Sequence, residues 1–342
     1  MSRARVGLMG FGRIGRNVFR MLHDHPRLEV VAIADIADPA GLTYLLKYDS
    51  IYGRFPRPLE FADDNLFLDG RRIPFIDARE PGDAPWGDLG VDLVVQATGK
   101  YRTAEWCYRH IEAGAAKVVL ASTPERPGDI PILLRGVNDE VLTPEVPVVA
   151  LGSNTSNALA PILDVLDTAF GIERAFFTTV HAMTNTQRLA DVPSEGFRQS
   201  RAAAENIIPT DTNSAEILEW VMPRFAGKLS AMALNVPVAD GSTVDLVTQV
   251  RSSATVAEVN AAIRSACEGR LAGIIEYVED PIVSSDVHSS THSGVYDSLA
   301  TMVMDGTLVK TITWFNNGWG YTARVVDVLD LMRIPVKEGV PA

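Results

Sequence analysis

The sequence is poor in cysteine, in positive charge and in long apolar segments. Its 342 residues include two cysteines, Cys107 and Cys267, whose spacing predicts neither a metal site nor a disulfide framework, so we expect buried, inert thiols. An excess of 43 acidic over 31 basic residues gives a net charge of −12, which argues against a general affinity for nucleic acid or anionic membranes. No apolar run approaches the ~20 residues of a membrane helix, and no signal peptide is evident. We expect a cytoplasmic protein without a metal.

The remaining composition is typical of a globular protein with a large core. Hydrophobic residues make up 46% of the chain and charged residues 22%. At about 150 residues per domain, the length predicts roughly two domains.

A glycine pattern follows the first apolar strand, 5–9. Gly10, Gly12 and Gly15 fit the spacing G-x-G-x-x-G ahead of a predicted helix, 13–24. In this pattern the first glycine allows a tight turn, the second lets a pyrophosphate approach the backbone, and the third allows close packing of helix and strand. The amides at the start of the helix would then hold the phosphates.

A second apolar strand, 29–34, ends at Asp35, about 20 residues beyond the glycines. A carboxylate at this place accepts hydrogen bonds from the two ribose hydroxyls and repels a 2′-phosphate, which favours NAD over NADP. The alternative is that Asp35 only caps a turn or a helix.

Two later strands, 91–96 and 117–121, end at Thr98-Gly99 and at Ser122. Ligands of open α/β sheets lie at such carboxyl ends, so these residues join the candidate cofactor site. The alternation of strands and helices predicts an α/β fold with a parallel, doubly wound sheet.

One segment interrupts this alternation. Residues 55–88 are rich in turn formers and contain an alternating stretch, 65–76. That pattern predicts a small antiparallel excursion from the parallel sheet.

Several separated blocks, in one order, resemble the glyceraldehyde-3-phosphate dehydrogenase family. These blocks are 10–16, 78–81, 85–86, 97–99, 153–161, 178–184, 201–209 and 317–321. The resemblance implies a Rossmann-type NAD-binding domain over 1–152, completed by a C-terminal helix, 319–333, and an α+β catalytic domain over 153–318. It also implies a homotetramer in which the loop 183–206 lies between subunits.

The block 153–161 departs from the family at its reactive residue. The family has Ser-Cys-Thr-Thr-Asn-Cys-Leu-Ala-Pro, and the two cysteines fall on Asn154 and Ala158 here. An amide cannot ionise into a nucleophile as a thiol can. By the resemblance, His181 matches the histidine that activates the thiol in the family. Where no thiol is present, an imidazole can take a proton from a substrate hydroxyl. His181 and Asn154 are therefore the candidate catalytic residues.

The resemblance adds residues to the cofactor site. Asn317 matches the asparagine that binds the nicotinamide carboxamide, and Tyr321 matches the aromatic residue beside that ring, although the neighbouring Asn316 and Gly318 replace the usual acidic residues. The full set of candidate cofactor residues is Gly10, Gly12, Arg13, Ile14, Asp35, Arg79, Thr98, Gly99, Ser122, Asn317 and Tyr321.

The substrate residues implied by the resemblance have changed more. Asn235 stands where the family has an arginine that grips the substrate phosphate, and Glu216 stands where a lysine is typical. Each lost charge-assisted hydrogen bond is worth about 1.5–3 kcal/mol, which lowers phosphate affinity tenfold or more and argues against glyceraldehyde 3-phosphate. The candidate substrate residues are Ser153, Thr155, Thr184, Thr212, Asn213 and Asn235, with Arg188, Arg198 or Arg201 as other possible anion contacts.

Three functions fit this pattern. The first is an NAD-dependent oxidoreductase that transfers hydride without a covalent intermediate on a small hydroxy or aldehyde substrate. The second is a catalytically inactive NAD-binding sensor or assembly protein on the same scaffold. The third is a phosphorylating aldehyde dehydrogenase that uses a serine nucleophile, Ser153 or Ser156.

Overall fold

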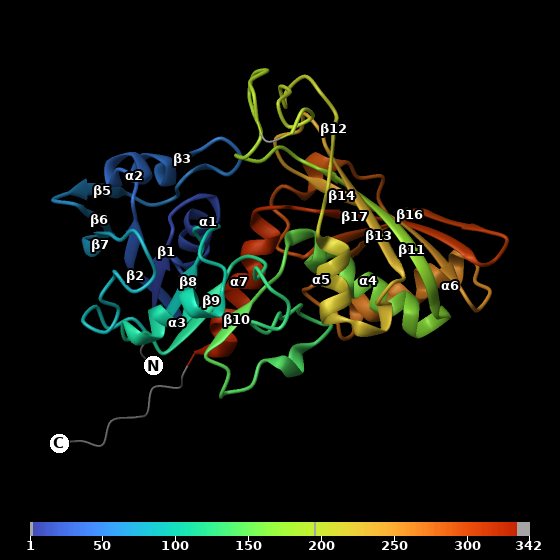
Figure 1. Ribbon diagram of the computed structural model, residues 1–342, viewed down its shortest axis with the longest axis horizontal. Coiled ribbons are helices and arrows are strands. Elements are labelled where there is room, and N and C mark those ends of the chain that lie inside the picture. Colours follow the sequence, from blue (N-terminus) through green and yellow to red (C-terminus); the bar gives the residue numbers. More distant parts are fainter. Residues whose placement is uncertain (1–2, 195, 334–342) are drawn as a thin grey trace. The chain divides into compact units, whose positions relative to one another are not determined.

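The computed structural model describes residues 3–194 and 196–333, which form two compact units (Figure 1). The first unit comprises residues 3–133, 140–152 and 322–333, and the second comprises 134–139 and 153–321 without residue 195. Within the described ranges, no helix has both the length and the apolar character that a membrane crossing requires.

The first unit is built on an eight-stranded sheet in the order β10-β9-β8-β1-β2-β7-β6-β5. Its strands are β1 (Ala4–Met9), β2 (Leu28–Asp35), β5 (Leu59–Ala62), β6 (Asn65–Leu68), β7 (Arg71–Asp77), β8 (Leu93–Gln96), β9 (Lys117–Leu120) and β10 (Val148–Ala150). The six strands from β10 to β7 are parallel, whereas β5 and β6 pair antiparallel. The predicted parallel sheet and its antiparallel excursion are both confirmed.

Helices also belong to this unit, and the first and third of them in the chain connect neighbouring parallel strands. The helices are α1 (Arg13–Leu22), α2 (Pro39–Lys47), α3 (Ala104–Glu112) and the greater part of α7 (Trp319–Met332), and a small hairpin joins β3 (Tyr48–Asp49) to β4 (Gly53–Arg54). Helix α1 ends two residues before the predicted end, because the chain turns there and the His25 amide donates to the carbonyl of Leu22 (3.1 Å).

The second unit is built on a seven-stranded mixed sheet in the order β12-β13-β11-β14-β17-β16-β15. Its strands are β11 (Ile172–His181), β12 (Ile208–Thr210), β13 (Leu229–Asn235), β14 (Ser242–Val250), β15 (Ile275–Val278), β16 (Gly294–Met304) and β17 (Leu308–Phe315). Its α-helices are α4 (Asn154–Phe170), α5 (Ser214–Val221) and α6 (Val256–Glu268). Short 3₁₀ helices cover Asp139–Val141, where the chain passes from the second unit to the first, Pro223–Phe225 and Ser284–Val287.

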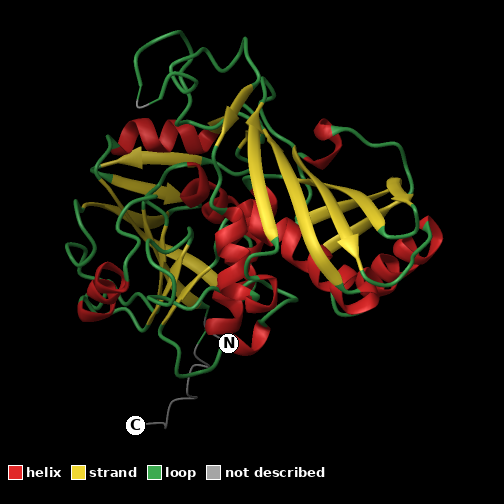
Figure 2. Ribbon diagram, turned by 45° about the vertical axis from the view of Figure 1, so that its right-hand side comes forward, coloured by secondary structure: helices red, strands yellow, loops and turns green. Residues whose placement is uncertain are grey.

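The two faces of this second sheet differ. Along β14 every second residue is buried, including Val244, Leu246 and Thr248, and α4, α5 and α6 gather on that side (Figure 2). The other side is partly exposed, and we call it the open face. Its apolar members are Phe176, Met232, Val247, Met302, Met304 and Leu308, with an Asp245–Lys310 ion pair among them.

A histidine lies in the core of the first unit. The indole Nε1 of Trp86 donates to Nδ1 of His110 (2.9 Å), and both side chains are fully buried. Burial disfavours the imidazolium and lowers the pKa of His110 to about 4. The native ring is therefore neutral at pH 7.

This buried ring makes stability depend on pH. The unfolded chain protonates His110 near pH 6.5 and the native chain only near pH 4, so stability is lost as the pH falls through that window. We expect wild-type protein to lose about 2 kcal/mol more unfolding free energy than His110→Gln between pH 7 and pH 5. Urea unfolding at both pH values measures the difference, and parallel losses in the two proteins would contradict the assignment.

Candidate cofactor and catalytic sites

Close backbone contacts explain two of the three glycines at the end of β1. Gly10 has a φ of +95°, and a Cβ there would lie 2.7 Å from the amide nitrogen of Thr98. A Cβ on Gly15 would lie 2.2 Å from the carbonyl oxygen of Gly10. A Cβ on Gly12 would meet nothing within 4 Å. No packing contact therefore requires a glycine at position 12. The open space beside it suits a ligand that approaches the backbone.

The start of α1 offers free donors beside Gly12. Gly12 is the N-cap residue and supplies no side-chain hydrogen bond, and Arg13 and Ile14 are the first two helical residues. Their amides have no partner inside the helix, and the helix dipole adds partial positive charge. This arrangement fits the phosphates of a dinucleotide.

A cavity of about 250 Å³ lies at the carboxyl ends of β1, β2 and β8. It brings together five of the predicted cofactor residues, namely Gly10, Gly12, Asp35, Arg79 and Thr98. The Asp35 carboxylate accepts from the amides of Phe11 (2.6 Å) and Ala37 (2.9 Å), so it braces the glycine turn as well as facing the cavity. Each oxygen keeps a second lone pair for a ribose hydroxyl.

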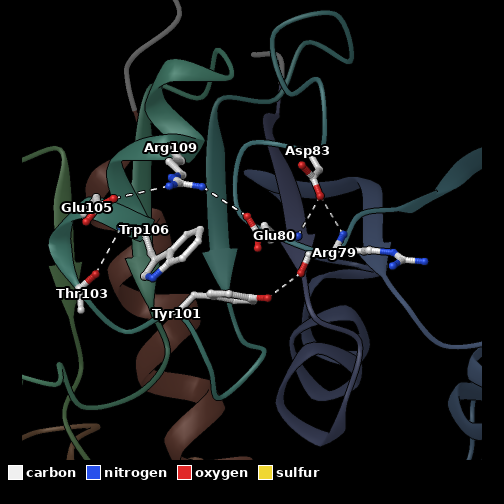
Figure 3. A network of polar contacts seen from close by, with 8 residues as sticks. All are labelled: Arg79, Glu80, Asp83, Tyr101, Thr103, Glu105, Trp106 and Arg109. Carbon is white, nitrogen blue, oxygen red and sulfur yellow. Dashed lines mark hydrogen bonds and ion pairs between the residues drawn. The ribbon is translucent and has the colours of Figure 1, made fainter.

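Sequence reasoning missed several residues that line this cavity, among them Ile36, Lys100 and Tyr101. Tyr101 has a φ of +53°, and its hydroxyl donates to the carbonyl of Arg79 (2.9 Å; Figure 3). The centroid of the Tyr101 ring lies 4.7 Å from the centroid of the Trp106 ring. Ile36 and Lys100 could have been found, since they directly follow the predicted strand-end residues.

Gly99 and Ser122 are among the predicted cofactor residues that do not line the cavity. Gly99 has a φ of +72° and shapes the turn after β8. Ser122 follows β9, and its Oγ is buried without a hydrogen-bond partner among the described residues. A buried hydroxyl without a partner is rare and fits contact with a bound polar ligand. Together with the open backbone at Gly12, it shows that this unit suits a dinucleotide.

In the second unit, helix α4 begins at Asn154. The hydroxyl of Ser153 caps the helix by accepting from the amide of Ser156 (3.0 Å), and the Ser156 hydroxyl accepts from the amide of Ser153 (2.9 Å) and donates to its carbonyl (2.8 Å). This reciprocal capping fixes the first turn of the helix and with it the backbone of Asn154. Thr155 is buried behind that turn.

The side chains of Asn154 and His181 meet at the end of β11. The Asn154 Oδ1 accepts from the amide of Thr155 (2.8 Å), so its Nδ2 faces the carbonyl of Asn317 (3.1 Å) and Nε2 of His181 (3.5 Å). The His181 Nδ1 lies 2.6 Å from the carbonyl of Ala182. A carbonyl only accepts, so Nδ1 carries the proton and Nε2 of the neutral ring is an acceptor.

One of the predicted nicotinamide residues of this unit, Asn317, is hydrogen-bonded to residues of the site. The hydroxyl of Ser242 donates to Oδ1 of Asn317 (3.4 Å) and accepts from the amide of Ala182 (3.0 Å). Sequence reasoning missed Ser242, because its place depends on strand pairing. Tyr321 is buried in the first turn of α7, and burial raises its phenol pKa.

One predicted substrate residue lies beside His181. Asn235 pairs with His181 in the parallel register of β13 and β11, so both side chains lie on the same face of the sheet. Other predicted hydroxyls are bonded within their own segments, Thr184 to Thr186 (2.9 Å) and Thr212 to Ser214 (2.9 Å). Asn213 is the exposed N-cap residue of α5 and makes no side-chain capping bond.

The cysteines and metal-ligand residues offer no other reaction centre. Both thiols are buried, and burial raises the pKa of Cys107 to about 12 and that of Cys267 to about 11. Within residues 3–194 and 196–333, no three His, Cys, Asp or Glu side chains gather to hold a metal ion.

A dinucleotide-binding sheet and a second unit that carries a histidine beside an amide define a two-domain, nicotinamide-dependent dehydrogenase. Residues 4–104 match the family described as "Glyceraldehyde 3-phosphate dehydrogenase, NAD binding domain", and residues 153–317 match its C-terminal domain. The chain belongs to the glyceraldehyde-3-phosphate dehydrogenase family. Its cofactor is NAD, which confirms the prediction from the glycine pattern and Asp35.

Similarity to individual family members extends over almost the whole chain. Glyceraldehyde-3-phosphate dehydrogenase of Geobacillus stearothermophilus is 46% identical over 325 residues, covering 95% of this chain and 96% of the relative. The enzyme of the same name from Thermotoga maritima is 45% identical over 331 residues, covering 96% and 99%. The predicted fold class, a Rossmann-type domain with an α+β catalytic domain, is confirmed.

The open space at Gly12 and the tight contact at Gly15 predict opposite phenotypes. We expect Gly12→Ala to fold normally but to raise the Kd for NAD at least about tenfold, since the methyl group enters the phosphate approach. Gly15→Ala should instead lower the melting temperature, because its Cβ collides with the Gly10 carbonyl. Calorimetry of binding and of unfolding separates the two effects, and equal unfolding temperatures would refute the packing argument.

Proposed function

We propose that the chain is an NAD-dependent oxidoreductase that transfers hydride without a covalent intermediate. Its substrate is a small hydroxy or aldehyde compound other than glyceraldehyde 3-phosphate. The observation that carries the proposal is the pairing of Asn154 with Nε2 of His181, at the place where the family resemblance puts the reactive cysteine. Bound NAD supplies the hydride acceptor.

His181 has the right tautomer for a general base. Its Nδ1 proton is held by the Ala182 carbonyl (2.6 Å), so Nε2 is the basic atom. The Asn154 contact to Nε2 is long at 3.5 Å, and a substrate hydroxyl displaces it at little cost. The substrate proton then moves to Nε2 as the carbonyl forms.

Asn154 supplies the complementary donor. The Thr155 amide holds Oδ1 (2.8 Å), which directs the Nδ2 hydrogens outward from the start of α4. A donor held in place costs no reorganisation when charge develops on the reacting oxygen. The amide cannot attack carbon, so no acyl or hemithioacetal intermediate forms on it.

The lining of this region favours an uncharged substrate. Asn235 takes the position beside His181 in the sheet, and an amide recognises hydroxyls and carbonyls rather than a dianion. Arg201 pairs with Asp191 (3.2 Å), which reduces its value as a phosphate ligand. The first turn of α5 carries the acidic Glu216, which disfavours an anionic substrate.

Of the two serines in the serine alternative, Ser156 has little support from the geometry as a nucleophile. The Ser156 hydroxyl is buried and donates to the Ser153 carbonyl, so its proton and lone pairs serve the helix cap. The inactive NAD-binding alternative keeps the cofactor site and differs only in the absence of turnover.

Turnover with NAD and a panel of small hydroxy compounds and aldehydes tests the proposal. We expect His181→Ala to lower kcat about 10²–10⁴-fold, the usual effect of removing a general base. Asn154→Ala should lower it by about 10²-fold, as loss of one preorganised donor does. Ser156→Ala should retain turnover. NAD binding without turnover of any panel member would favour the inactive alternative, and a burst of acyl-enzyme would favour the serine.

We also propose that the chain forms a homotetramer and that the open face takes part in its contacts. Phe176 and Met302 are 64% and 60% exposed, and the register Phe176–Val247–Lys310–Met302 places them on one surface. Exposed apolar groups gathered on one sheet are typical of a subunit interface.

Light scattering after size-exclusion chromatography tests this assembly. Wild-type protein should elute as a tetramer, and Phe176→Asp should shift it to dimers or monomers because a carboxylate would be buried in the contact. Leu331→Asp, at an exposed apolar residue of α7, is the matched control and should leave the mass unchanged. A monomeric wild-type protein would exclude the proposal.

A further inference from the structure

A buried chain of hydrogen bonds runs from Trp86 through His110 and Gln96 to the turn at 98–101. Trp86 Nε1 contacts His110 Nδ1 (2.9 Å), and His110 Nε2 contacts Gln96 Oε1 (3.4 Å). Gln96 Nε2 then donates to the hydroxyl of Thr98 (3.1 Å) and the carbonyl of Lys100 (3.1 Å). The first three side chains are at most 1% exposed.

The Trp86 end of this chain of hydrogen bonds fixes which atoms donate and which accept along it. An indole nitrogen only donates, so His110 Nδ1 must accept. The neutral ring then carries its proton on Nε2 and donates to the Gln96 oxygen. That contact turns the NH₂ group of Gln96 toward the turn, where the Lys100 carbonyl is an obligatory acceptor.

The turn that receives these bonds is strained and lines the cofactor cavity. Tyr101 adopts a left-handed conformation (φ +53°), which side-chain-bearing residues rarely adopt without support. Thr98 Oγ1 bonds the amide and carbonyl of Lys100 (both 3.1 Å), and Tyr101 is tethered to Arg79 from the other side (Figure 3). Thr98, Lys100 and Tyr101 all face the cavity.

We propose that His110 is a positioning residue for the cofactor: through Gln96 it holds the 98–101 turn in the conformation that binds NAD. His110 does not line the cavity, and its effect passes entirely through hydrogen bonds. Losing its ring nitrogens leaves the Trp86 Nε1 donor and the Gln96 Oε1 acceptor without partners, so Gln96 can reorient and the strained turn can relax.

Binding of NAD to the full-length protein, measured by calorimetry, tests the role without relying on turnover. His110→Phe keeps an aromatic ring but removes both nitrogens, and it should raise the Kd roughly five- to tenfold, the effect of one lost buried hydrogen bond. His110→Gln can accept from Trp86 and donate to Gln96, so it should restore the Kd to within about twofold. Gln96→Met should weaken binding as His110→Phe does, and it replaces that variant if His110→Phe does not fold.

Cys107→Ala is the matched control. It truncates a buried side chain one turn earlier on α3 without removing a member of the hydrogen-bond chain, so it should change the melting temperature but not the Kd. The proposal is overturned if His110→Phe and Gln96→Met bind NAD as wild type does. It is also overturned if Cys107→Ala weakens binding equally, or if His110→Gln does not restore it.

Discussion

Backbone-to-backbone contact at the end of β1 is the constraint on which the first unit depends. Gly10 sits against the amide of Thr98, and Gly15 sits against the carbonyl of Gly10, so β1, β8 and α1 approach more closely than side chains would permit. This approach brings the start of α1, the carboxylate of Asp35 and the 98–101 turn to one cavity. The sheet order with β1 beside β8 places that cavity at the point where the chain changes direction across the sheet.

Two histidines show how a neighbour that can only donate or only accept a hydrogen bond fixes which ring nitrogen carries the proton. His110 faces an indole donor and is left with its proton on Nε2, whereas His181 faces a carbonyl acceptor and is left with its proton on Nδ1. The same side chain therefore becomes a donor inside the first unit and a basic atom in the second. Burial keeps His110 neutral at pH 7 and so preserves its role.

Local patterns were enough to predict the glycine turn and the strand ending at Asp35. Each rests on residues close together in the chain. The pairing of His181 with Asn235 and the bond of Ser242 to Asn317 depend on strand register, which joins residues 54 and 75 positions apart. The left-handed Tyr101 and the open face could not be predicted for the same reason, because each is set by packing from distant segments.

The burial of both thiols has a consequence for how the protein tolerates oxidants. Peroxide attacks thiolates, and the raised pKa values of Cys107 and Cys267 leave almost none at neutral pH. The side chain at position 154 is an amide, which peroxide does not convert to a sulfenic acid. The proposed reaction centre of Asn154 and His181 would therefore work independently of the thiol redox state of its surroundings.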